Sequence, residues 1–164
     1  MSRDIDPTEE SRWRPLHVLL RAMDDDIARV YADRGVTDVR PRLVKPLIRL
    51  GRRGAMTIRE LADSLDVTHS AMSQTVETLR RSGLVTTEPG PDARTRHVRL
   101  TKRARELAAL LEAEWRATED AIAELEAELP YPMSQVVRDL EAALARRSFR
   151  DRVVAHLPES REEP

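Results

Sequence analysis

Apolar residues recur every three or four positions over much of this sequence, which is the period expected of amphipathic helices. Residues 11–34 form the first such segment, and Gly35 stands where a C-terminal cap belongs. The apolar stripe consists of Trp13, Leu16, Leu20, Met23, Ile27 and Tyr31. The pattern predicts one long helix with a single apolar face.

The longest apolar pattern lies in the C-terminal part, where a helix is expected from Thr101 to Leu129. Alternating steps of four and three residues are typical of a coiled-coil seam. The seam positions are Ala104, Ala108, Leu111, Trp115, Thr118, Ile122, Leu125 and Leu129. Two prolines then break the pattern, and a last amphipathic helix is expected from Met133 toward Val154.

A second helix is expected to run to about Leu50, with Thr37 and Asp38 as its N-terminal caps and Gly51 and Gly54 ending it. Two shorter helices follow. Thr57 is expected to cap residues 58–65, with Glu60 completing a capping box. Thr68 is expected to cap a helix through Ser82, with Met72, Val76 and Leu79 facing inward. The result is a helix, a tight turn and a second helix.

Residues 84–88 are a short strand candidate, residues 89–92 are typical of a turn, and residues 96–100 alternate in polarity. The sequence therefore predicts a β-hairpin with Val98 and Leu100 on its buried face. The fold class that follows is mainly α with a small β-hairpin wing (α+β), a winged helix-turn-helix flanked by N- and C-terminal dimerisation helices. The expected domains are an N-terminal dimerisation helix (1–35), a winged helix-turn-helix DNA-binding domain (36–100), and C-terminal dimerisation helices with a tail (101–164).

Charge is unevenly distributed, although the formal net charge is only -1. Residues 36–104 contain 14 basic and 7 acidic side chains, whereas both flanking segments are acidic. A basic segment between acidic flanks indicates a polyanionic partner for the middle of the chain. Single-stranded RNA is a poor candidate, because this segment lacks aromatic residues on which bases stack. Double-stranded DNA is the expected partner.

The composition argues against several other kinds of site. With no cysteine, the chain has no disulfide or thiolate chemistry. His17, His69, His97 and His156 lack metal-ligand spacing, so neither a metal nor a cofactor is expected. Ser70 with His69 is the nearest approach to a catalytic pair, but adjacent helical residues point about 100° apart. No enzyme activity is expected, and the absence of long apolar stretches indicates a cytoplasmic protein without a membrane partner.

Polar side chains on the outer face of the 68–82 helix suit a DNA major groove, where Gln pairs with adenine and Ser or His bonds several bases. The expected DNA contacts on this helix are Thr68, His69, Ser70, Ser73, Gln74, Glu77, Arg80 and Arg81. The hairpin adds Asp92, Arg94 and Arg96; Arg94 at its tip is placed to enter a minor groove, oriented by Asp92. A solvated helix face with a surface ion pair is the simpler alternative.

The sequence resembles the MarR family of bacterial regulators over roughly residues 11–147. The segments that carry the resemblance are IRELA (58–62), SAMSQ (70–74), LRRSGLV (79–85), DAR (92–94) and VRLT (98–101). The resemblance implies a homodimer with intertwined terminal helices, a recognition helix in each major groove, and wing arginines near the minor groove. The sequence departs from the family pattern at Thr87, where a basic residue is common, and at Ala104, where glycine is usual.

Repression at a pseudo-palindromic operator is the function that the resemblance implies, with a small anionic or aromatic effector in a pocket that the family often has. The candidate ligand-binding residues are Trp13, His17, Arg21 and Trp115, although the two tryptophans also suit a dimer core. The alternative function is a winged helix that binds another protein, without sequence-specific DNA binding. An exposed apolar recognition face would favour that alternative, and the face here is polar.

Overall fold

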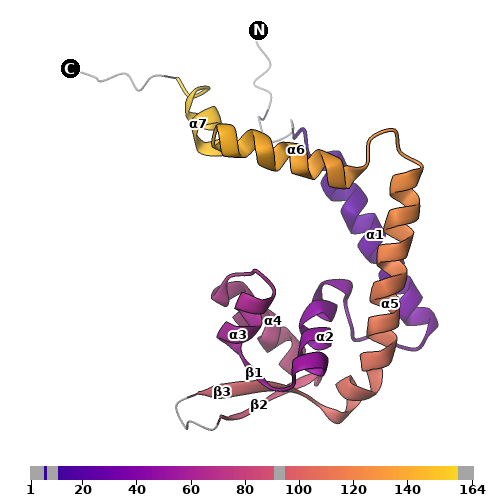
Figure 1. Ribbon diagram of the computed structural model, residues 1–164. Coiled ribbons are helices and arrows are strands. Elements are labelled where there is room, and N and C mark those ends of the chain that lie inside the picture. Colours follow the sequence, from indigo (N-terminus) through magenta and orange to yellow (C-terminus); the bar gives the residue numbers. More distant parts are fainter. Residues whose placement is uncertain (1–5, 7–10, 91–94, 159–164) are drawn as a thin grey trace. The chain divides into compact units, whose positions relative to one another are not determined.

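A computed structural model describes residue 6, residues 11–90 and residues 95–158 (Figure 1). Its helices and strands are α1 (Arg14–Asp33), the 3-10 helix η1 (Pro41–Leu43), α2 (Val44–Arg53), β1 (Met56–Thr57), α3 (Ile58–Ser64), α4 (His69–Arg81), β2 (Val85–Pro89), β3 (Arg96–Leu100), α5 (Lys102–Ala127), α6 (Met133–Arg146) and α7 (Phe149–Val154). They form two units, Met1–Ala113 and Glu114–Pro164, and α5 runs from the first into the second.

Helix α1 ends as its sequence predicts. Gly35 adopts a positive φ of 74°, and its N–H donates to the carbonyl of Ala32 at 2.9 Å. The N–H of Val36 donates to the carbonyl of Tyr31, also at 2.9 Å, which completes a Schellman motif. Tyr31 is fully buried, whereas Trp13 lies just before the helix and is 55% exposed.

The prediction for the second helix was wrong at its start, and at its end Gly54 is confirmed but Gly51 is not. Arg40 is extended because a following proline disfavours helical backbone, so the chain enters α2 through η1 without a side-chain cap. Asp38 instead forms an ion pair with Arg103 at 2.7 Å. Gly51 lies inside α2, and the helix ends at Gly54, whose φ is 82°.

The caps predicted for the helix-turn-helix are confirmed. The Thr57 hydroxyl accepts from the N–H of Glu60 at 3.2 Å, and the Glu60 carboxylate accepts from the N–H of Thr57 at 2.7 Å. At the start of α4, the Thr68 hydroxyl accepts from the N–H of Ala71 at 3.2 Å. Gly83 follows α4 with a φ of 66° and turns the chain toward β2.

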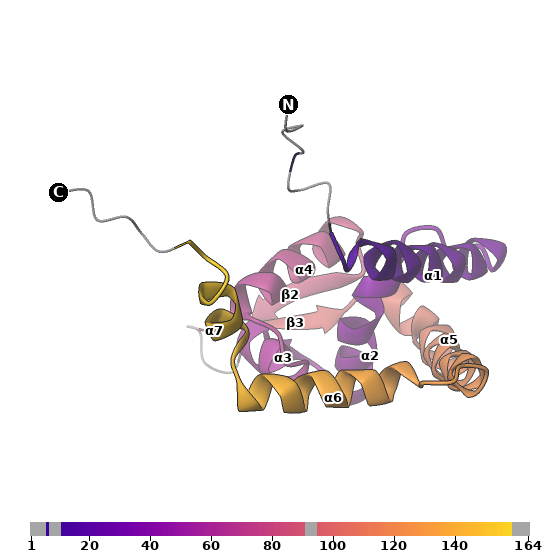
Figure 2. The same cartoon turned by 90° about the horizontal axis from the view of Figure 1, so that it is seen from above.

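The described strands form an antiparallel sheet in the order β1-β3-β2, and α2, α3 and α4 lie on one side of it (Figures 1 and 2). The sequence predicted the β2–β3 hairpin but not β1, which pairs Met56 with Val98. Val98 and Leu100 are buried, as their alternation predicted. They share the core of the first unit with Leu61, Leu79 and Leu84, each of which has no exposed surface.

Two ion pairs and one hydroxyl fix the start of α5 within the first unit. Besides the Asp38–Arg103 pair, Arg52 of α2 forms a bidentate pair with Glu112. The Thr101 hydroxyl donates to the carbonyl of Gly83 at 2.9 Å and accepts from the N–H of Ala104 at 3.3 Å. The turn after α4, the end of β3 and the first turn of α5 are therefore joined at one side chain.

After α5, the described part of the second unit contains two helices, α6 and α7, where the sequence predicted one. Arg147 is extended, and the Ser148 hydroxyl accepts from the N–H of Asp151 at 3.0 Å, which starts α7. Proline precedes α6 and offers no side-chain cap, so the Glu126 carboxylate accepts from the N–H of Ser134 at 2.7 Å instead. Across residues 6, 11–90 and 95–158, no helix is long and apolar enough to cross a membrane.

The capping box makes a pH-dependent contribution to stability. Hydrogen bonds from the Thr57 N–H and hydroxyl lower the pKa of Glu60, because they favour its charged form. That contribution is complete above the ordinary pKa of glutamate and is lost as pH falls through the lower pKa of the folded state. We expect the temperature at the midpoint of thermal unfolding to decrease as the pH is lowered from about 5 to about 3. The decrease should be smaller in Glu60→Gln. An identical pH profile for both proteins would contradict this assignment.

Candidate nucleic-acid interface

Helix α4 presents a polar face because its apolar face is fixed in the core. Met72, Val76 and Leu79 are buried at successive turns, as predicted. The side chains on the opposite face of α4 are therefore directed outward. This orientation brings the residues predicted to read bases onto one surface.

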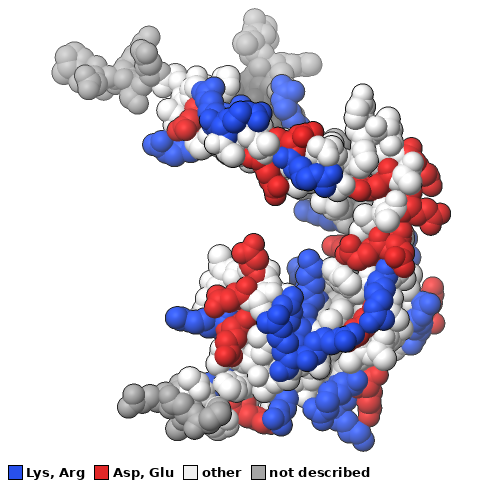
Figure 3. Space-filling view, in the orientation of Figure 1, with Lys and Arg blue, Asp and Glu red and all other residues white. Residues whose placement is uncertain are grey.

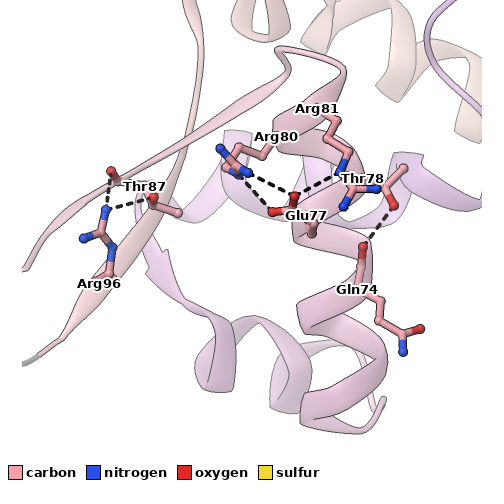
Figure 4. Close-up of polar contacts among 7 residues, drawn as sticks. All are labelled: Gln74, Glu77, Thr78, Arg80, Arg81, Thr87 and Arg96. Atoms are coloured by element: carbon pink, nitrogen blue, oxygen red, sulfur yellow. Dashed lines mark hydrogen bonds and ion pairs between the residues drawn. The ribbon is translucent and has the colours of Figure 1, made fainter.

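The first turns of α4 carry short polar groups. Thr68, His69, Ser70 and Gln74 are exposed, and Ser73 is partly exposed. The Gln74 side chain extends away from the helix (Figure 4), and within the described ranges its amide makes no hydrogen bond. An amide with both its donor and its acceptor available can form the two-bonded pair with adenine that the major groove offers.

The last turns of α4 hold a cluster that the sequence did not predict as a unit. The Glu77 carboxylate accepts from Arg80 Nε at 2.9 Å and from Arg80 Nη2 at 3.0 Å. It also accepts from Arg81 Nε at 3.0 Å (Figure 4). The hydrogen bond from Arg80 is the largest cause of the lowered pKa of Glu77, and it raises the pKa of Arg80 in turn. We call Glu77, Arg80 and Arg81 the carboxylate clamp.

The wing carries Arg96 on β3. Its guanidinium donates to the Thr87 hydroxyl at 3.2 Å and lies 3.4 Å from the Thr87 carbonyl oxygen (Figure 4). Thr87, which departs from the family pattern, thus orients a wing arginine. Asp92 and Arg94, predicted to lie at the wing tip, are outside the described residues.

A basic stripe on η1 and α2 was missed by the site prediction. Figure 3 shows lysine and arginine side chains gathered over α2. The stripe consists of Arg42, Lys45, Arg49, Arg52 and Arg53. Steps of three and four residues place them on one helical face. This spacing is present in the sequence, where these residues entered the prediction only through the net charge of the segment.

The candidate effector residues are not all on one element. Trp13 and His17 are exposed at the start of α1, and Trp115 belongs to the second unit. Arg21 lines a cavity of about 350 Å³ between α1 and η1. The other lining residues are Asp24, Asp25, Ala28, Arg40, Pro41 and Arg42. Acidic and basic groups therefore share this cavity, which the sequence did not predict.

No group of three or more His, Cys, Asp or Glu side chains in the described ranges is placed to hold a metal ion. The geometry consists instead of a polar helix face, a neighbouring hairpin and a basic helix. Together they define a winged helix-turn-helix protein.

Comparison with known proteins shows a family similarity in the winged-helix segment. Residues 47–94, which span α3, α4 and β2, match the MarR family model. Among curated proteins, no relative matches this sequence. The winged-helix segment is therefore similar to the MarR family, which the sequence also resembles. The match to the MarR family model supports the prediction that the protein is not an enzyme.

Solved structures share the fold at low sequence identity. The chain is similar to MepR of S. aureus in complex with DNA, with a TM-score of 0.60 and 15% identity over 84% of this chain and 98% of MepR. It is also similar to the transcriptional regulator SlyA, with a TM-score of 0.56 and 13% identity over 88% and 99%. Overoxidized AbfR bound to DNA aligns with a TM-score of 0.54 and 16% identity over 80% and 88%. The fold is that of MarR-family transcription regulators.

Proposed function

We propose that the protein is a homodimeric, sequence-specific DNA-binding repressor that acts in the cytoplasm on a pseudo-palindromic operator. The observation that carries the proposal is the polar outer face of α4, whose first turns expose Ser70 and Gln74 beside a hairpin with Arg96. MepR and AbfR, which share the fold, were solved with DNA.

Unpartnered apolar surface supports the homodimer. Among the described residues of the second unit, the large exposed apolar side chains are Leu125, Leu129, Tyr131, Met133, Val136, Val137, Leu140, Leu144, Phe149, Val153, Val154 and Leu157. In α1, Val18, Leu19 and Leu20 are each about half exposed. Apolar surface on this scale is typical of an interface. A second copy of the chain, related by twofold symmetry, would place two α4 helices on two half-sites about one DNA turn apart.

The residues divide into two roles. Thr68, His69, Ser70, Ser73 and Gln74 lie near the start of the recognition helix, where base edges are read. Arg94, Arg96 and the basic stripe supply contacts to phosphate or the minor groove, with Asp92 orienting Arg94. Arg80 and Arg81 belong to the same DNA-binding surface, where both are paired with Glu77. Promoter access is then blocked when the operator is occupied.

Two substitutions test this division. Gln74→Ala should change the preference at one position in each half-site, with a loss of discrimination of about 1–3 kcal/mol. Arg94→Ala should weaken binding to all sequences and reduce the salt dependence, because it removes a sequence-independent contact. Selection from random duplex DNA, followed by binding assays at several salt concentrations, measures both effects. Equal effects of both substitutions on every sequence would contradict the division.

A small anionic or aromatic effector is proposed to release the DNA, with Arg21 as the anchor for its negative charge. The cavity beside Arg21 supports this role, because its three arginines, Arg21, Arg40 and Arg42, outnumber the two aspartates, Asp24 and Asp25, in the lining. Trp13, His17 and Trp115 complete the proposed set of ligand-binding residues. Benzoate is a suitable probe, and Arg21→Ala should abolish any release of DNA that benzoate causes in the unchanged protein.

The first test of the proposal is selection of random duplex DNA by the purified protein at two salt concentrations. Recovery of an inverted repeat, with affinity falling steeply as salt rises, would support the proposed regulator. Failure to retain duplex DNA even at low salt would overturn it. That result would favour the alternative, a winged helix that binds another protein.

A further inference from the structure

A carboxylate in the middle of a proposed DNA-binding surface requires a physical explanation. Glu77 lies on α4 one turn before two arginines, and like an ordinary glutamate it is ionised at neutral pH. The hydrogen bond from Arg80 is the largest cause that lowers its pKa further, and Arg81 adds to it. An unpaired carboxylate there would repel phosphate. The clamp leaves these three side chains with a charge of about +1, where the arginines alone would carry about +2.

The geometry shows how much of the carboxylate is already occupied. Oε2 accepts from Arg80 Nε, and Oε1 accepts from both Arg80 Nη2 and Arg81 Nε. A carboxylate offers about four lone-pair positions, so three are used within the helix. Glutamate can also accept a hydrogen bond from cytosine in the major groove. The observed contacts favour a role toward the arginines over base reading.

Arg80 and Arg81 are the two arginines of α4. Their side chains are 55% and 76% exposed, so solvent and ions reach both. Exposed ion pairs are individually weak and are screened by salt, so DNA phosphates can compete for these guanidinium groups. The position of DNA on the helix therefore decides whether these guanidinium groups bind the Glu77 carboxylate or a phosphate.

We propose that Glu77 is a specificity-determining residue that withholds Arg80 and Arg81 from phosphate and so suppresses sequence-independent binding. This inference rests on the proposed function. At an operator, the first turns of α4 supply base contacts and the clamp stays closed. On other DNA, affinity comes almost entirely from phosphate contacts, and the closed clamp removes two of them.

The test compares Glu77→Gln with the unchanged protein on the selected operator and on random duplex DNA. Glutamine keeps the shape and helix propensity of glutamate but not its charge. Each released arginine that reaches a phosphate steepens the dependence of log affinity on log salt by about 0.9. We expect a slope steeper by about 1–2 on random DNA, affinity raised roughly 10-fold at low salt, and a smaller change on the operator.

A matched control separates the clamp from net charge. Glu106 of α5 forms an i,i+4 pair with Lys102 at 3.8 Å, so Glu106→Gln makes the same charge change and also releases a basic side chain. That variant should leave the ratio of operator to random affinity unchanged. A variant that combines Glu77→Gln with Arg80→Ala and Arg81→Ala should lose the steeper dependence of log affinity on log salt. Circular dichroism melting shows whether each variant is folded.

The outcomes are distinguishable. If the unchanged protein binds DNA and Glu77→Gln leaves both slopes unaltered, the clamp inference is overturned while the proposed function stands. Loss of a cytosine preference without a change in slope also overturns it and assigns base reading to Glu77. If the unchanged protein binds no duplex at low salt, the proposed function and the inference both fail.

Discussion

Replacing Leu140 with aspartate is expected to separate the homodimer into single chains and to weaken operator binding by about 100-fold or more. Leu140 lies on the apolar face of α6 and is 41% exposed in the single chain. A symmetric interface would bury the new charge twice, and an unpaired buried charge costs several kcal/mol. Each 1.4 kcal/mol corresponds to about a factor of ten in affinity. Sedimentation velocity over a range of concentrations measures the dissociation.

Ala142→Asp provides the matched control, because Ala142 is exposed on the opposite face of the same helix. It introduces the same residue two positions away and should leave the oligomeric state unchanged. Equal sedimentation of the Leu140 variant and the unchanged protein would contradict the proposed interface. Weakening by both variants would show instead that α6 tolerates no added negative charge.

Leu79→Ala is expected to lower the free energy of unfolding by about 2–5 kcal/mol, since it removes a fully buried side chain and leaves a cavity. Leu79 joins α4 to the core of the first unit. Typical domains are stable by only about 5–15 kcal/mol, so the loss is a large fraction of the total. Denaturation by urea, monitored by circular dichroism, measures the change.

Gln74→Ala is the control on the same helix, because its exposed side chain should alter the free energy of unfolding by less than about 0.5 kcal/mol. A cost below about 1 kcal/mol for Leu79→Ala would mean that α4 is not fixed by this contact. The two variants also separate stability from DNA reading. Leu79→Ala is expected to lower stability without altering base preference, whereas Gln74→Ala is expected to keep its stability with altered preference.

The sequence predicted most helices of the winged unit, because each carries its own local signals. Thr57 with Glu60, and Thr68 before α4, are caps that need no distant partner. The start of the second helix was predicted wrongly because Thr37 and Asp38 are residue types that often cap helices. Asp38 instead pairs with Arg103, far along the chain. Strand β1 was missed because two residues carry no periodicity, and only pairing with β3 defines it.

The sequence predicted which residues belong to the candidate site but not which of them are in contact. Spacing placed Gln74 and Glu77 on the outer face of α4, since one apolar stripe fixes the opposite side. Spacing alone did not show that Glu77 binds both following arginines, because side-chain rotamers decide which neighbours meet. The pairing of Arg96 with Thr87 depends on the register of the hairpin, which the sequence leaves open.

The Thr101 hydroxyl has a consequence for how the first unit meets DNA. It bonds the carbonyl of Gly83, directly after α4 and before the hairpin, and the N–H of Ala104 in α5. The Thr101 N–H also donates to the carbonyl of Leu84 at 3.0 Å. These bonds restrain the angle between α4 and the hairpin. On the proposed operator, differences between half-sites would then be met by side chains more than by movement of the backbone, which favours a narrow set of targets.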